Sequence, residues 1–140
     1  MDTIKKLNKW ANSHTSLPLD LIRIVLGAFV FYKGINFSVH TSYLYDILNP
    51  LDEWMGTVMI VHYVTMAHLA GGILIVIGLI TRVAVLVQIP VLIGAILINF
   101  IGMMNTTNLI ASFVVFFGCL FFLVYGSGKH SVDYALKMQM

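Results

Sequence analysis

The chain has 140 residues, of which 59% are hydrophobic and 10% are charged, and its formal net charge is +2. A soluble domain of this length buries only about two thirds of its chain surface, so this much apolar surface must face lipid. Soluble enzymes, nucleic-acid-binding proteins and disordered chains are therefore excluded, and we expect a single integral membrane domain over residues 1–140.

The N-terminal segment carries an apolar stripe and, away from it, three lysines: Ile4, Leu7, Trp10 and Ala11, then Lys5, Lys6 and Lys9. This pattern is typical of an amphipathic helix lying in the inner membrane interface. A solvated tail is the alternative interpretation.

Four segments approach the roughly 20 apolar residues that a hydrocarbon core of about 30 Å requires. They are residues 19–37, 57–80, 82–104 and 107–125. Short connections favour antiparallel neighbours, so the predicted fold class is all-α, a transmembrane four-helix bundle. In the outer connection, residues 38–56, Leu44, Ile47, Leu48 and Leu51 recur at helical spacing and predict a short amphipathic helix.

Seven of the eight Lys and Arg residues fall on one side of this arrangement: Lys5, Lys6, Lys9, Arg23, Arg82, Lys129 and Lys137. Only Lys33, near the far end of the first span, falls on the other side. The positive-inside rule then puts both termini in the cytoplasm.

In the first span, one helical stripe holds two charged residues, two glycines and an aromatic residue: Asp20, Arg23, Gly27, Phe31 and Gly34. The glycines allow a neighbouring helix to approach closely. Arg23 has two interpretations, packing beside Asp20 or holding an anionic headgroup or a ligand carbonyl. Lys33 lies off this stripe and is expected to extend toward the outer headgroups.

One face of the second span holds Met55, Met59, His62 and Met66. One face of a single helix supplies too few ligands to identify a metal or haem site, so we predict no metal. His68 lies on a different face, near the bilayer midplane. It has two interpretations, a structural hydrogen bond or a role toward a proton or ligand.

In the third span, Gln88 and Asn99 lie eleven residues apart on one face, with Pro90 as an expected kink. Interhelical hydrogen bonds are the default interpretation of such amides. The alternative is that polar groups at several depths accept an amphiphile such as a quinone. The candidate ligand-binding residues are Arg23, Lys33, His62, His68, Gln88 and Asn99. Cys119 lies in an apolar run and is interpreted as a small buried hydrophobe.

Several strings, in this order, resemble the DoxX family of small four-helix membrane proteins. RIVLG at 23–27, followed by Phe31 and Gly34, is similar to the family's opening pattern. HLAGG at 68–72 and GLITR at 78–82 resemble its glycine pair and its Gly-Leu-x-Thr-Arg turn, and GSGKHSVD at 126–133 is similar to its tail. The resemblance runs from about Pro18 to Asp133 and implies the four-helix membrane fold. Many family members carry a glutamate where His68 stands, so an acidic role does not transfer to this position.

The matching strings also predict structural roles at the inner turn and tail, for Gly71, Gly72, Gly78, Thr81, Arg82, Ser131 and Asp133. Gly78 is expected to end the second span, Thr81 to cap the third and Arg82 to anchor the turn. Ser131 and Asp133 are expected to seat the tail against that turn, with an ion pair between Asp133 and Arg82.

The family includes a subunit of a thiosulfate:quinone oxidoreductase and relatives linked to membrane redox maturation or oxidative-stress complexes. The resemblance therefore implies an accessory subunit in quinone- or thiol-linked redox processes of the bacterial inner membrane, with quinone as the candidate ligand. Membrane lipids, other membrane or periplasmic proteins and further copies of the chain are the expected partners. With one cysteine and no haem, flavin or nucleotide motif, an enzyme acting alone is disfavoured. The alternative is a non-catalytic scaffold or cargo-binding protein acting through its outer loop; transport is weaker because no inverted repeat is present.

Overall fold

A computed structural model of the protein describes residues 2–13, 17–48, 56–101, 106–126, 128 and 131–136. Its secondary structure in these residues is entirely helical: α1 (Asp2–Ser13), α2 (Leu17–Val39), α3 (Thr41–Leu48), α4 (Thr57–Ile77), α5 (Thr81–Ile101), α6 (Thr106–Tyr125) and α7 (Val132–Ala135). The helices α2, α4, α5 and α6 are each long and apolar enough to cross a membrane. The prediction of an all-α protein with four transmembrane helices is confirmed.

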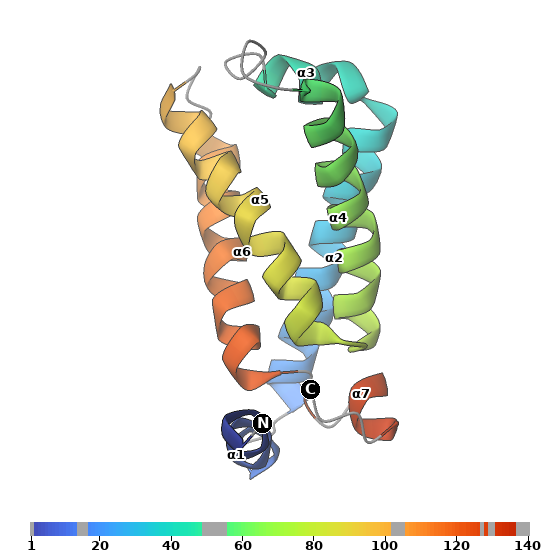
Figure 1. Cartoon of the computed structure of the whole chain (residues 1–140), viewed down its shortest axis with the longest axis vertical. Helices are drawn as coiled ribbons and strands as arrows, with labels where there is room; N and C mark the ends of the chain where they lie inside the picture. Colours follow the sequence, from blue (N-terminus) through green and yellow to red (C-terminus); the bar gives the residue numbers. More distant parts are fainter. Residues whose placement is uncertain are drawn as a thin grey trace.

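The four long helices run alternately up and down, with α1 and α7 at one end and α3 at the other (Figure 1). Both chain termini lie at the end that carries α1 and α7 (Figure 1). Helix α2 packs mainly on α4 and α5 mainly on α6, whereas α2 and α6 meet over a smaller region. The bundle therefore consists of two helix pairs, and these diverge toward the α3 end (Figure 1).

Glycines bring α2 and α4 into backbone contact. A Cβ at Gly27 would lie 2.7 Å from the Val76 amide nitrogen, and one at Gly34 would lie 2.9 Å from the Leu69 nitrogen. Real side chains do not fit at such distances, so the close approach requires glycine on α2. The glycine stripe predicted to be a packing face is found against α4.

The main apolar core of the described residues includes Val30, Ile75, Val85, Cys119 and Phe122. The outward faces of the long helices are apolar as well, and large side chains such as Val25 and Phe117 are more than 60% exposed. A helix that is hydrophobic all round is typical of a membrane span, because its outer face contacts lipid. The burial predicted for Cys119 is confirmed.

Helix α4 ends at Ile77, three residues before the predicted boundary. Gly78 adopts a left-handed conformation, with φ 73°, and its N–H donates to the Leu74 carbonyl. This is a glycine C-cap, and the turn that follows carries the apolar Leu79 before α5 begins at Thr81. Hydropathy alone predicts a longer second span, because the residues of this turn are as apolar as those of the helix.

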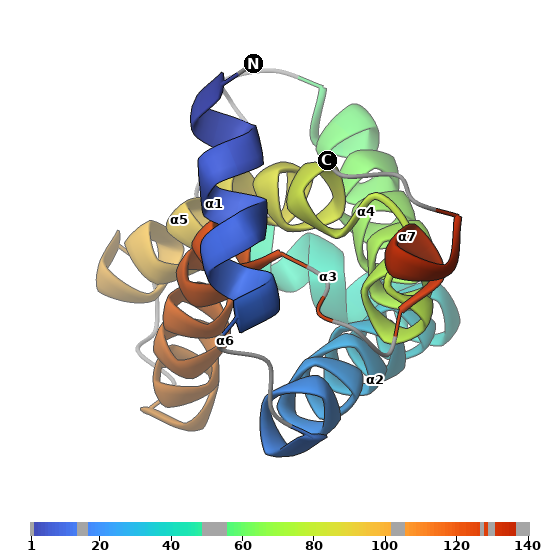
Figure 2. The same ribbon diagram turned by 90° about the horizontal axis from the view of Figure 1, so that it is seen from below.

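The two short amphipathic segments predicted outside the spans are helical. Helix α1 lies across the end of the bundle (Figure 2) and packs against α6. Its lysines, Lys5, Lys6 and Lys9, are exposed. Helix α3 lies in the outer connection, so the short helix predicted there is confirmed, and it packs against both α2 and α4. The rest of that connection, 49–55, and residues 102–105 at the predicted end of the third span lie outside the described residues.

Candidate functional site

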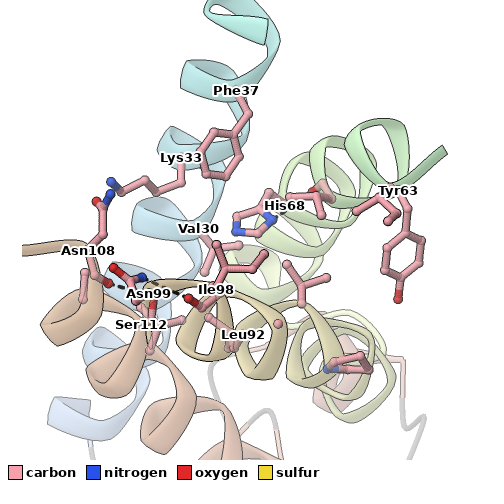
Figure 3. A pocket seen from close by; sticks show the side chains of 18 of the residues that line it. Val30, Lys33, Phe37, Tyr63, His68, Leu92, Ile98, Asn99, Asn108 and Ser112 are labelled. Atoms are coloured by element: carbon pink, nitrogen blue, oxygen red, sulfur yellow. Dashed lines mark hydrogen bonds between the residues drawn. The ribbon is translucent and has the colours of Figure 1, made fainter. Parts of the chain in front are cut away.

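A cavity of about 260 Å³ lies between the two helix pairs, and all four long helices contribute to its walls. Most of the lining is apolar, including Phe29, Phe37 and Leu92. Six polar or charged side chains border it: Lys33, Tyr63, His68, Asn99, Asn108 and Ser112 (Figure 3). An apolar cavity with a few polar groups is the usual form of a small-molecule site, and this volume suits a head group with the remainder of the ligand outside.

The wall contributed by α5 explains why the space stays open. Pro90 lies inside the helix and lines the cavity. Its ring removes one backbone N–H and disturbs the helix one turn earlier. Gly94 follows one turn later, and a Cβ built there would meet no atom within 4 Å. Helix α5 therefore leaves the space beside Gly94 unfilled.

His68 reaches the cavity from α4 and is only 8% exposed. Its Nδ1 lies 2.8 Å from the Val64 carbonyl oxygen, which can only accept, so Nδ1 carries the hydrogen and donates it. The Phe37 ring meets the imidazole edge-on, with 5.3 Å between the ring centroids. The other ring nitrogen, Nε2, makes no hydrogen bond within the described part of the chain and faces the cavity (Figure 3).

Lys33 enters from α2 and is the one charged side chain among the described residues that line the cavity. Its Nζ lies 5.8 Å from the centroid of the Phe29 ring, a cation–π contact. In Figure 3 the lysine extends along the cavity toward Asn108. The cavity therefore combines apolar walls with a single positive charge.

Three of the remaining polar side chains each donate a hydrogen to a backbone carbonyl. Tyr63 donates to Val87 at 3.3 Å, Asn99 to Ala95 at 2.9 Å and Ser112 to Asn108 at 2.8 Å. These hydrogens are already used within the protein. The Nε2 of His68, which makes no hydrogen bond within the described part of the chain, and the Nζ of Lys33 are two polar atoms that the cavity presents to a ligand.

The structure brings together three of the six predicted ligand-binding residues, namely Lys33, His68 and Asn99. His62 does not border the cavity; it lies exposed on α4, where its Nδ1 donates to the Val58 carbonyl at 2.7 Å. Sequence reasoning missed Tyr63, Asn108 and Ser112. Asn108 and Ser112 are four residues apart, so their shared helical face in the fourth span was the available signal.

Arg23 and Gln88 lie outside the cavity, and each binds backbone on a neighbouring helix. The Arg23 Nη1 donates to the Ile75 carbonyl of α4 at 3.1 Å, and the Gln88 amide donates to the Ala67 carbonyl of α4. Both side chains are 1% exposed. These contacts fit the packing interpretation of Arg23 and the interhelical interpretation of Gln88.

Three of the predicted turn and tail residues, Gly78, Arg82 and Ser131, lie at the end of the bundle that carries α1 and α7. Arg82 donates from Nε to the Leu123 carbonyl and from Nη2 to the Val124 carbonyl, each at 3.1 Å, so it holds the end of α6. A Cβ at Gly78 would collide with Arg23 and Ser131, which places the tail against the turn. The Asp133 side chain lies outside the described residues, so its ion pair with Arg82 stays a prediction.

Three further residues of the predicted set also pack tightly, one at the start of α5 and two inside α4. Thr81 is fully buried at the start of α5. A Cβ at Gly71 would collide with the Gln88 amide, and one at Gly72 would lie 2.6 Å from the Phe31 nitrogen. The backbone contact therefore requires glycine at position 72, whereas a side chain at position 71 would displace the Gln88 amide.

The fold and the cavity define a multi-pass helical membrane protein with an internal pocket. Residues 19–102, more than half of the chain, match the family model described as DoxX, and the chain belongs to the DoxX family. The match stops before 126–133, so the resemblance of the tail rests on its residues alone. No curated protein and no solved structure matches the chain.

Proposed function

We propose that this DoxX family membrane protein binds a lipid-soluble amphiphile in the cavity and serves as an accessory subunit in quinone- or thiol-linked redox processes of the bacterial inner membrane. The observation that carries the proposal is the cavity itself. It lies within membrane-spanning helices, its walls are apolar, and it presents the Nε2 of His68 and the charge of Lys33. Polar and ionisable groups inside membrane spans are costly and tend to be functional.

A quinone head group fits these residues. Lys33 can donate to a ring carbonyl, and Phe29 and Phe37 offer aromatic surface to the ring. Bound there, a quinone would supply the redox chemistry that the chain's own residues lack. The single cysteine, Cys119, is buried and does not line the cavity, so thiol exchange would require cysteines of a partner protein. These points favour an accessory subunit over an enzyme acting alone.

The proposed orientation puts both termini in the cytoplasm. Exposed Lys5, Lys6 and Lys9 on α1 lie at the same end of the bundle as Arg82, at the start of α5 (Figure 1). Lys33 lies nearer the opposite end, where α3 is found. The positive-inside rule favours the lysine-rich end for the cytoplasm. In that orientation the cavity opens within the outer half of the membrane.

Gentle purification from native membranes tests ligand binding, with mass spectrometry of the lipids and quinones that remain bound. Gly94→Leu fills the cavity from a position where a Cβ meets nothing within 4 Å. Gly94→Ala is the matched control, because it changes the same backbone position and adds only a methyl group. We expect a bound amphiphile with the native protein and with Gly94→Ala, and at least about a tenfold loss with Gly94→Leu, the effect of losing roughly 1.4 kcal/mol of binding.

Two outcomes would argue against this function. A native protein that purifies without any bound amphiphile would remove its support. The second outcome concerns partner proteins that co-purify with the chain. If Asp46→Lys in α3 abolishes their co-purification and both Gly94 variants keep it, the alternative of a scaffold acting through the outer loop is favoured. Asp46 is exposed on α3 and does not line the cavity, so this comparison separates the two roles.

A further inference from the structure

The hydrogen on His68 is placed by its own helix. The Val64 carbonyl lies 2.8 Å from Nδ1 and can only accept, so the neutral imidazole carries its hydrogen on Nδ1 and a lone pair on Nε2. Turning the ring over would put a C–H group opposite the Val64 carbonyl and lose this bond. Phe37, packed edge-on at 5.3 Å, also holds the ring plane. The cavity therefore presents a hydrogen-bond acceptor at Nε2.

Lys33 presents the opposite character, because an ammonium group only donates. No carboxylate of the described residues lines the cavity, so its charge is not neutralised there by this part of the chain. A complementary head group must donate a hydrogen to His68 and offer a lone pair to Lys33. A ring with two oxygens, at least one of which is a hydroxyl, has this combination.

We propose that the cavity selects the reduced, hydroxyl-bearing form of its ligand, a hydroquinone, over the corresponding quinone. This inference rests on the proposed function and names its ligand class. A hydroquinone hydroxyl donates to the Nε2 of His68, and a ring oxygen accepts from Lys33. A quinone has only carbonyl acceptors. One carbonyl can accept a hydrogen bond from Lys33, but the other would place its oxygen lone pair against the lone pair of Nε2. The phosphodiester group of a lipid also lacks a donor and is disfavoured opposite Nε2 for the same reason.

His62 offers a matched control on the same helix. It makes the same bond as His68, from Nδ1 to the carbonyl four residues earlier, here Val58 at 2.7 Å. It is exposed and does not line the cavity. A substitution of His62 therefore removes the same chemical group from α4 without touching the cavity.

The test measures anaerobic binding of a short-tailed benzoquinone, its hydroquinone and the dimethyl ether of that hydroquinone to the full chain in lipid nanodiscs. We expect the hydroquinone to bind at least about tenfold more tightly than the quinone, the effect of one hydrogen bond to a buried group. The ether should bind as weakly as the quinone, because it lacks the hydroxyl hydrogen. His68→Phe should reduce the preference to about twofold or less, and His62→Phe should keep it.

A tenfold preference for the reduced form also raises the midpoint potential of the bound couple by about 30 mV, which a redox titration can measure. Equal or tighter binding of the quinone by the native protein would overturn the selection while leaving the proposed function intact. A preference that survives in His68→Phe would also overturn it. If neither ring binds the native protein, both this inference and the proposed function fail. The ether comparison uses the native protein alone, so it decides the question even if His68→Phe does not fold.

Discussion

Gly72 of α4 lies so close to Phe31 of α2 that a Cβ on the glycine would stand 2.6 Å from the Phe31 backbone nitrogen. Small residues are the usual means by which membrane helices approach each other, because lipid gives no hydrophobic drive for their association. The same pair of helices carries Lys33 and His68 on its cavity side. The distance between these helices therefore also fixes the separation of the two polar groups that face a ligand.

Gly72→Val should destabilise the protein. The added side chain overlaps backbone, which cannot rotate away, so the helices must separate. Overpacking of this kind typically costs about 1–3 kcal/mol. Thermal unfolding of the purified protein, followed by size-exclusion chromatography after heating, should show a lower Tm.

Gly94→Ala is the control for this prediction. It is also a glycine substitution inside a long helix, but its Cβ meets no atom within 4 Å. Its Tm should stay at or slightly above the native value, because alanine is the better helix former by about 1 kcal/mol. Equal Tm values for Gly72→Val and the native protein would show that α2 and α4 do not depend on this contact.

Gly71 and Gln88 should be energetically coupled. A Cβ at Gly71 would collide with the Gln88 amide that donates to the Ala67 carbonyl. Gly71→Ala should therefore destabilise the native protein by displacing this amide. In a Gln88→Ala background the obstacle is gone, and the same change should be neutral or stabilising. We expect a coupling energy of about 0.5–3 kcal/mol in a double-mutant cycle.

The measurement is the Tm or the denaturant midpoint of the four proteins in one detergent. A matched cycle with Gly94→Ala and Gln88→Ala should give no coupling, since a Cβ at Gly94 meets no neighbour. Additive effects of Gly71→Ala and Gln88→Ala would contradict the contact between them.

Most of the fold can be predicted from two features of the sequence, the hydropathy of its segments and the spacing of its glycines. Span length and hydropathy predict the four long helices, because each must cross a hydrocarbon core of about 30 Å. Glycine spacing places Gly27 and Gly34 on one face, and that face is the one against α4. Hydropathy predicts the end of α4 three residues late, because it assigns the apolar residues of the turn after Gly78 to the span.

The candidate site was predicted only in part, because depth along a helix does not determine which neighbour covers a face. Lys33 and Asn99 are both predicted candidates, and they do border one cavity. His62 is a predicted candidate as well, yet it lies exposed on α4 and does not border that cavity. Periodicity groups residues on one helix, whereas a cavity depends on the mutual rotation of several helices. Asn108 and Ser112 line the cavity because the rotation of α6 about its axis turns their face toward it.

Arg82 should be more important for stability than its partial exposure suggests. Its guanidinium donates to the Leu123 and Val124 carbonyls, which lie in the last turn of α6 and lack helical partners. Arg82→Ala should lower stability by about 1–3 kcal/mol. Arg82→Lys should recover only part of the loss, because an ammonium group does not reproduce the planar fork that reaches both carbonyls.

Hydrogen exchange measured by mass spectrometry should localise this effect. Amides near the end of α6 should exchange faster in both variants than in the native protein, while those of α4 should change less. Lys9→Ala, which removes an exposed cation from α1 at the same end of the bundle, is the control and should leave both Tm and exchange unchanged. An unchanged Tm in Arg82→Ala would show that α6 does not need this anchor.

Cysteine labelling tests the orientation of the bundle. The native Cys119 is fully buried, so Cys119→Ala gives a background without a thiol, at the cost of a small cavity. In that background, Asp46→Cys on α3 and Lys9→Cys on α1 place a thiol at opposite, exposed ends of the bundle (Figure 1). A membrane-impermeant maleimide added to intact bacterial spheroplasts should label Asp46→Cys at once and Lys9→Cys only after permeabilisation, because the lysine-rich end is expected in the cytoplasm.

The reverse pattern would place the termini outside and the cavity in the inner half of the membrane. Labelling of both thiols before permeabilisation would show that the protein inserts in both orientations.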